Sequence, residues 1–180
     1  MLRRIFQSIL LTICLLFLSV RVYSSGNIYW GHGSQTRNIN VANFYDNYNP
    51  TWCSVINNSI ITWNSYANVT ISISSTSPNY VSVGNYGHDW SGLFYPTGYN
   101  GDYITGYIVY LNYSEILQFS GDFSNVARSV CTHEFGHAFW LDDNPPGSNA
   151  YNSLMNGNRD RNVIYVPQTM DINNVNAKYP

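Results

Sequence analysis

The stretch HEFGHAFWLDD, residues 133–143, decides the fold that we expect for this 180-residue chain. On a helix, residues four apart lie one turn apart on the same face, so His133 and His137 can direct their imidazole nitrogens at one zinc ion. Glu134 would lie beside them, close enough to take a proton from a water molecule on the metal. The alternative is a helix whose histidines are ordinary buried or surface polar groups. The small residues Gly136 and Ala138 favour a buried, closely packed helix.

A catalytic zinc ion normally has three protein ligands, and the two histidines supply only two of them. The chain has four histidines in all, and the other two, His32 and His88, are far away in sequence. Asp142 and Asp143 follow His137 by five and six residues, and either carboxylate could bind zinc once the helix has ended. The spacing alone leaves both open.

Taken together, these residues resemble the signature HExxHxxGxxH of the metzincin zinc peptidases, and most closely that of the matrixin branch. His133, Glu134 and His137 match its first three functional positions. Asp143 falls where the pattern has its third histidine, as in the snapalysin-type metzincins, which carry Asp in this place. The resemblance therefore favours Asp143 over Asp142 as the third ligand.

Two later segments extend the resemblance. Residues 153–156 look like the methionine turn of metzincins, which puts Met155 beneath the metal, and residues 169–180 look like the closing helix of matrixins. The resemblance implies a zincin-like domain that hydrolyses peptide bonds, with zinc as cofactor and Glu134 as general base and then general acid. It also allows a contribution from calcium. The dense His/Asp pattern of the matrixin structural metal sites is not reproduced, so we expect His32 and His88 to be surface histidines.

Trp140 departs from the signature, because it replaces a glycine at the end of the helix. That glycine often adopts a positive φ, and a bulky residue in this conformation costs about 1–2 kcal/mol. Either the turn is built differently here or the strain is tolerated. The departure motivates an alternative from another class, a secreted binding or adhesion module on a catalytically degenerate scaffold. A zinc hydrolase that acts on something other than peptides is a third reading.

In metzincins, an extended peptide pairs antiparallel with an edge strand above the zinc-binding helix. We expect residues 107–112 to be that strand. The pocket next to the metal would be walled by the segment after the methionine turn, which includes Arg159, Arg161 and Tyr165. The two arginines could favour an acidic side chain, but we expect both to be solvated surface charges.

The whole pattern predicts a single α/β domain with one mixed, twisted sheet of about five strands and three helices. Alternation and β-branched residues predict strands over residues 28–30, 39–41, 69–73, 80–83 and 107–112. Helices are expected from the cap at Asn49 to about Tyr66, from near Ser124 to about Trp140, and over residues 169–179. Residues 84–102 are typical of a long surface loop, and Pro145-Pro146-Gly147 predicts a firm break.

The first 24 residues predict a signal peptide. Arg3 and Arg4 precede an apolar run over residues 5–20, and Ser24 offers a cleavage site. The alternative is an uncleaved anchor, but the run is short for a membrane span. We therefore expect a secreted, extracellular catalytic domain over residues 25–180, with no membrane association after cleavage. The net charge of −2 offers no attraction to nucleic acid. We expect a monomer whose partner is a peptide or protein substrate.

Two cysteines, Cys53 and Cys131, remain once the signal peptide and its Cys14 are removed. In an exported chain such a pair suggests a disulfide, and we expect one here. The alternative is a pair of buried free thiols.

Overall fold

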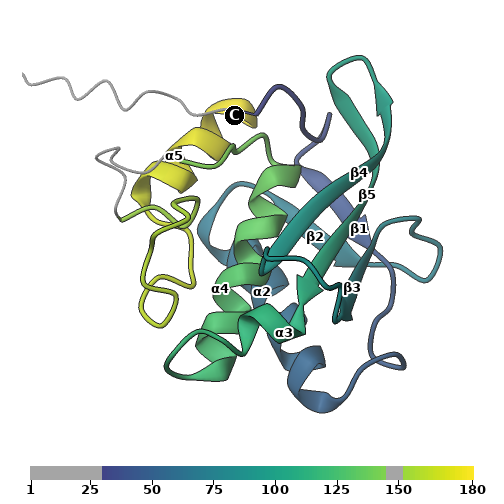
Figure 1. The fold of residues 1–180 in the computed structure, drawn as a ribbon. Helices are drawn as coiled ribbons and strands as arrows, with labels where there is room; N and C mark the ends of the chain where they lie inside the picture. The colour runs from purple at the N-terminus through teal and green to yellow at the C-terminus, as the bar shows by residue number, and fades with distance from the viewer. Residues whose placement is uncertain (1–29, 145–151) are drawn as a thin grey trace, which may run out of the picture.

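The computed structural model describes residues 30–144 and 152–180 (Figure 1). The predicted signal peptide, the break at Pro145-Pro146-Gly147 and most of the strand expected over residues 28–30 lie outside this range. The described residues form five strands and four helices in one mixed α/β domain, which confirms the predicted fold class. The strands form two sheets where one was predicted, and the short helix α3 was not predicted. In chain order, the elements are β1 (Asn38–Val41), α2 (Pro50–Tyr66), β2 (Thr70–Ile73), β3 (Tyr80–Gly84), β4 (Gly92–Asn100), β5 (Tyr103–Asn112), α3 (Tyr113–Ile116), α4 (Phe123–Ala138) and α5 (Thr169–Lys178).

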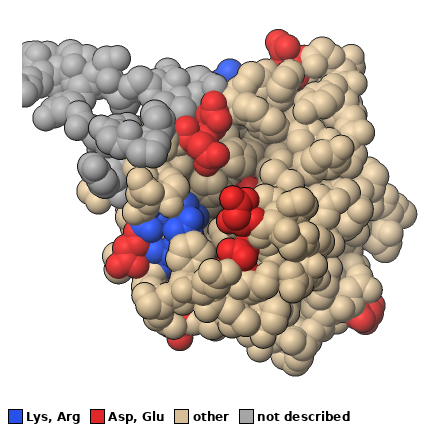
Figure 2. All heavy atoms as spheres, viewed as in Figure 1, with Lys and Arg blue, Asp and Glu red and all other residues tan. Residues whose placement is uncertain are grey.

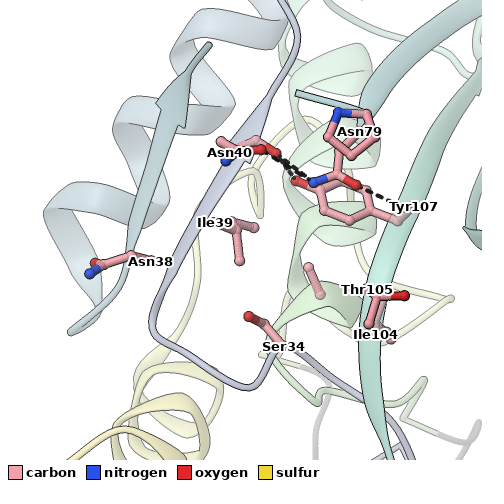
Figure 3. Close-up of a pocket in the computed structure, with 10 residues that line it drawn as sticks. Ser34, Asn38, Ile39, Asn40, Asn79, Ile104, Thr105 and Tyr107 are labelled. Carbon is pink, nitrogen blue, oxygen red and sulfur yellow. Dashed lines mark hydrogen bonds between the residues drawn. The ribbon is translucent and has the colours of Figure 1, made fainter. Parts of the chain in front are cut away.

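The five strands form two hydrogen-bonded sheets. β1 and β2 are parallel, while the second sheet has the order β3-β5-β4, with β3 parallel and β4 antiparallel to β5. The side chain of Asn79 spans the seam between the sheets, as Figure 3 shows. Its Nδ2 donates to the carbonyl of Asn40 in β1 at 3.0 Å, and its Oδ1 accepts from the backbone N–H of Tyr107 in β5 at 3.0 Å. The Tyr107 hydroxyl donates to the same Asn40 carbonyl at 3.0 Å, so side chains link β1 to β5 in place of a main-chain ladder.

Two sequence predictions about the second sheet were wrong. Residues 84–102 are not one long loop, because they contain β4, and the strand expected at the edge, residues 107–112, lies in the centre of the sheet as part of β5. The edge strand is β4 instead. Proline is tolerated at a sheet edge because its missing N–H faces no partner, and the register of β4 against β5 shifts between Pro96 and Gly98. Because Pro96 and Gly98 are unusual in strands, the sequence pattern did not predict one here.

Two long helices pack against each other beneath the strands. α2 begins as expected, with the Asn49 side chain accepting from the backbone N–H of Trp52 and Pro50 in the first turn. In the core, the indole of Trp63 donates to the carbonyl of Thr132 at 2.8 Å, which ties α2 to α4. α4 also contacts β4 and β5. No helix within the described ranges is long and apolar enough to cross a membrane.

The predicted disulfide is absent: Cys53 and Cys131 are both buried free thiols. The two sulfurs have different surroundings. Cys53 faces the segment before α2, where its sulfur lies 3.4 Å from the carbonyl oxygen of Tyr48, whereas Cys131 is fully buried in α4 beside Ser59 of α2. Burial raises the pKa of the Cys131 thiol to about 12, so it stays protonated at neutral pH.

Candidate metal centre

His133 and His137 lie one turn apart in the last part of α4. The Nδ1 of His133 lies 2.9 Å from the carbonyl oxygen of Leu154, and the Nδ1 of His137 lies 2.7 Å from that of Leu141. A carbonyl oxygen can only accept a hydrogen bond, so each Nδ1 carries the ring proton. Each Nε2 is then left with a lone pair, which is the state in which histidine binds a metal.

Asp143 joins the two histidines. Its Oδ1 lies 3.0 Å from the Nε2 of His133 and 4.0 Å from the Nε2 of His137, and one ligand atom from each of the three residues lies within 4.8 Å of the others. Asp142 is arranged differently, because its Oδ1 accepts a hydrogen bond from the backbone N–H of Asp143. Of the two carboxylates that the spacing left open, the fold brings Asp143 to the histidine pair.

The chain reaches Asp143 through a turn at Trp140, whose φ is +72°. The strain at this residue is tolerated because its side chain is held on several sides. Its indole N–H donates to the carbonyl of Ser34 at 2.9 Å, and its ring lies flat against Gly33, which has no Cβ to collide with it. The edge of the Tyr103 ring and the ammonium of Lys178 also contact the indole. Trp140 therefore fills the place of the signature glycine while keeping its backbone conformation.

The three converging groups suit a divalent zinc ion. Two nitrogens and one carboxylate oxygen are ligands that zinc prefers, and two ligands at about 2.0 Å in a tetrahedral arrangement lie about 3.3 Å apart. The observed spacings of 3.0 and 4.0 Å bracket that value. Burial, helped by the charge of Arg159, lowers the pKa of His133 to about 4, and burial lowers that of His137. Both imidazoles are thus neutral at pH 7, and each can offer the lone pair of its Nε2 to a metal ion.

Asp143 supplies the negative charge of the group. Burial acts to raise the pKa of its carboxyl, but the interactions with His133, His137 and Arg159 outweigh it, and the pKa falls to about 2. Asp143 is therefore ionised at neutral pH, and the donor set as a whole carries one negative charge, which favours binding of a dication.

Glu134 lies between the histidines and strand β4. Its two carboxylate oxygens are 3.9 Å from the Nε2 atoms of His133 and His137, so it adjoins the metal position without joining the ligand group. Gly92 lets the strand pass directly over it, because a Cβ at Gly92 would collide with the Glu134 carboxylate. Burial and the charge of Asp143 raise the pKa of Glu134 to about 8. A dication beside it would lower that pKa.

Met155 is buried and packs against α4 at Gly136, the residue before His137. A Cβ built on Gly136 of α4 would meet the Met155 sulfur at 2.7 Å, so the glycine allows the methionine turn to pack directly against the helix. Asp171 in α5 holds this turn, since it accepts hydrogen bonds from the Ser153 hydroxyl and the Leu154 backbone N–H. The carbonyl of Met155 in turn accepts from the N–H of Asn144, next to Asp143. The contribution of Asp171 was not foreseen; its only sequence signal was its position in the first turn of α5.

A groove crosses this group of residues. One half is lined by Trp30, Leu93 and Phe94, and the other by Trp90, Arg159 and Arg161, while Gly92, His133, Glu134 and Asp143 belong to both halves. The arginine half encloses about 400 Å³. On the face that Figure 2 shows, basic side chains gather beside a hollow with acidic side chains across it. The expectation that Arg159 is a solvated surface charge was wrong, because it is 5% exposed and hydrogen-bonded to residues 129 and 156.

The remaining candidate residues lie outside the group. His88 is exposed and stacks on Trp90, and His32 lies half-buried between Trp30 and Tyr99. Within the described ranges, His133, His137 and Asp143 form the one group of three or more His, Cys, Asp or Glu residues that could hold a metal ion, and it includes neither histidine. Tyr165 does not line the groove and instead lies beneath the guanidinium of Arg128.

No protein-family model matches this chain, and no curated protein matches its sequence. Its structure is similar to a chain in the GM1-bound form of the ECX AB5 holotoxin, with a TM-score of 0.54 and 14% identity over 78% of each chain. At this identity the similarity concerns the fold alone. A weaker similarity, with a TM-score of 0.44 and 14% identity over 87% of this chain and 96% of the other, links it to high choriolytic enzyme 1, a hatching-enzyme zinc protease of the medaka fish Oryzias latipes. A TM-score below 0.5 does not establish a shared fold.

Proposed function

We propose that this chain is a secreted zinc-dependent endopeptidase of the metzincin type. The observation that carries the proposal is the convergence of the His133 and His137 Nε2 atoms with the Asp143 carboxylate, with Glu134 3.9 Å from each histidine nitrogen. Residues 133–143, which supply these groups, resemble the metzincin signature, with Trp140 and Asp143 as departures from it. Signal-peptide cleavage and export, predicted from the first 24 residues, complete the proposal.

The residues of the site have separate roles. A zinc ion held by His133, His137 and Asp143 would activate a water molecule and polarise the carbonyl of the bond to be cut. Glu134 takes the proton of the attacking water and later donates it to the leaving amine. The carbonyls of Leu154 and Leu141 keep the two imidazoles oriented and in the right tautomer.

Strand β4 provides the surface on which a peptide would lie. It is at the edge of its sheet and runs over Glu134, and Gly92, Leu93 and Phe94 line the groove. An extended peptide pairs with such an edge through backbone hydrogen bonds. In the antiparallel orientation its chain runs toward the beginning of β4, so residues after the cut bond lie toward Gly92 and the arginine half of the groove.

The decisive experiment compares the mature chain, residues 25–180, with the variant Glu134→Ala. Zinc content is measured on both, together with cleavage of a quenched peptide library in the presence and absence of a hydroxamate chelator. We expect cleavage by the parent chain alone, blocked by the hydroxamate, with zinc bound to both proteins. Undiminished cleavage by Glu134→Ala would refute the mechanism.

The same experiment separates the alternatives. A parent chain that binds zinc but cuts no peptide would favour a binding module, or a zinc hydrolase with a different substrate. A folded chain that takes up no zinc would remove the basis of the proposal. The resemblance also allows calcium to contribute to stability. Thermal unfolding of the mature chain, measured with and without added calcium, checks this.

A further inference from the structure

Two guanidinium groups lie at one end of the groove without an acidic partner. Arg159 and Arg161 both line this end, together with the carboxylates of Asp89, Glu134 and Asp143. Among the described residues, no ion pair within 4.0 Å involves either arginine. Glu134 and Asp143 face the histidines of the metal centre instead.

Arg159 is fixed in place but keeps part of its bonding capacity. Its Nε donates to the Ser129 hydroxyl, its Nη2 to the Ser129 carbonyl and its Nη1 to the Asn156 carbonyl, at 2.9–3.0 Å. A guanidinium has five N–H bonds, so one remains on each terminal nitrogen. A rigid pair of donors of this kind matches the two oxygens of a carboxylate.

Arg161 adds a second charge that is less tightly held. Its guanidinium lies over the Phe119 ring at 4.2 Å, and its buried Nε has no hydrogen-bond partner. Burial lowers the pKa of both arginines, and Arg161 lowers that of Arg159 further, while the nearby carboxylates, Glu134 above all, only partly oppose this. Two neighbouring cations that disfavour each other in this way would both be stabilised by one incoming anion.

We propose that this end of the groove binds the side-chain carboxylate of a substrate Asp or Glu, at the residue that follows the cut bond. The position rests on the proposed function and on antiparallel pairing with β4, which directs that part of the peptide past Gly92. Arg159 provides the fixed donors, and Arg161 provides the charge that selects an acid over its amide. The site thus favours acidic peptide segments.

The test uses peptides with amidated C-termini, so that a side chain supplies the carboxylate. Matched pairs differ only by Asp or Asn, or by Glu or Gln, after the cut bond. For the zinc-loaded mature chain we expect kcat/KM to favour the acid by about 10- to 100-fold, the usual range for a hydrogen bond to a charged group. Arg161→Gln should lose this preference, and Arg161→Glu should shift it toward Lys. Arg37→Gln, at an exposed arginine that bonds Asn68, is the matched control and should keep it.

A binding measurement tests the pocket without catalysis. The variant Glu134→Gln is titrated with fluorescent versions of the same peptides, and anisotropy gives their dissociation constants. Tighter binding of the acidic peptide, lost when Arg161→Gln is added, supports the proposed pocket. If the pocket shows this preference but the parent chain cuts no peptide, the endopeptidase proposal fails and the pocket stands. Equal binding of acid and amide overturns the pocket, whatever the cleavage result.

Discussion

Asp171 accepts a hydrogen bond from the hydroxyl of Ser153 at 2.5 Å, so a residue of α5 holds the turn beneath the metal centre. The other carboxylate oxygen of Asp171 accepts from the backbone N–H of Leu154, whose carbonyl orients the imidazole of His133. Two hydrogen bonds through Leu154 therefore connect α5 to the proposed metal ligand His133, although α5 itself supplies no ligand.

Replacing Asp171 by Asn should weaken both the fold and the metal site. An amide has one acceptor oxygen where the carboxylate offers two, so a buried donor loses its partner, at a cost of about 2–4 kcal/mol in the free energy of unfolding. Zinc affinity should fall by about 10- to 100-fold, as for other residues that orient a ligand. Denaturant unfolding and a zinc competition titration measure the two effects. Asp46→Asn, at an exposed carboxylate, should change neither.

Two substitutions of Trp140 should show that its backbone is strained. Both Trp140→Ala and Trp140→Gly remove the contacts of the indole, but only alanine still has a Cβ at a φ of +72°. We therefore expect the glycine variant to be more stable than the alanine variant by about 1 kcal/mol, the reverse of the usual order. Chemical denaturation of the two proteins side by side decides it. An alanine variant at least as stable as the glycine variant would contradict the strain.

Zinc should stabilise the folded chain, because its proposed ligands converge only in the fold. A free zinc concentration 100 times the dissociation constant should add about 2.7 kcal/mol to the free energy of unfolding. Thermal unfolding with zinc or with a chelator measures the difference. His137→Ala should abolish it and His88→Ala should keep it, since His88 is exposed and outside the ligand group. An equal response of the two variants would speak against the assignment.

Gly92→Ala should reduce peptide cleavage more than zinc binding. The new Cβ would collide with the Glu134 carboxylate and lie 2.6 Å from a methyl of Val130, so either the glutamate or strand β4 must move. A displacement of this kind at a catalytic group costs roughly 100-fold in rate. Steady-state kinetics and zinc content measure the two. Gly31→Ala, where an added Cβ meets nothing within 4 Å, is the control.

Both cysteines should be recovered as thiols without any reducing agent. In the folded protein they should resist alkylation, because both are buried and the pKa of Cys131 is raised to about 12. In denaturant they should react completely. Peptide mapping by mass spectrometry checks this, and a peptide linking Cys53 to Cys131 in the untreated sample would show that a disulfide forms after all.

The parts of this molecule that could be predicted from sequence are those determined by local pattern. The apolar spacing of α2, its cap at Asn49 and the alternation of β2 depend on neighbours within a few residues. The histidine pair follows from helix geometry in the same way. Strand β4 was missed because Pro96 and Gly98 are unfavourable in most strands and are acceptable here only at an edge with a register shift.

The rest depended on tertiary contacts that no local pattern indicates. Arg159 is buried because the fold brings Ser129 of α4, thirty residues away in sequence, within hydrogen-bond reach of its guanidinium. Asp142 and Asp143 could not be separated by spacing, since their roles differ only in how the chain turns after Trp140. The two cysteines lie on helices that pack together, yet their sulfurs have different neighbours. The presence of two cysteines therefore wrongly suggested a disulfide.

The hydrogen bonds from the methionine turn to Asp171 of α5 also affect when the site can form. During synthesis, His133 and His137 leave the ribosome well before Asp171, so α4 is complete while the support for its floor is still missing. We expect the nascent chain to stay inert until α5 has emerged and docked. Such a delay would keep the proposed hydrolase inactive until the whole chain has been synthesised.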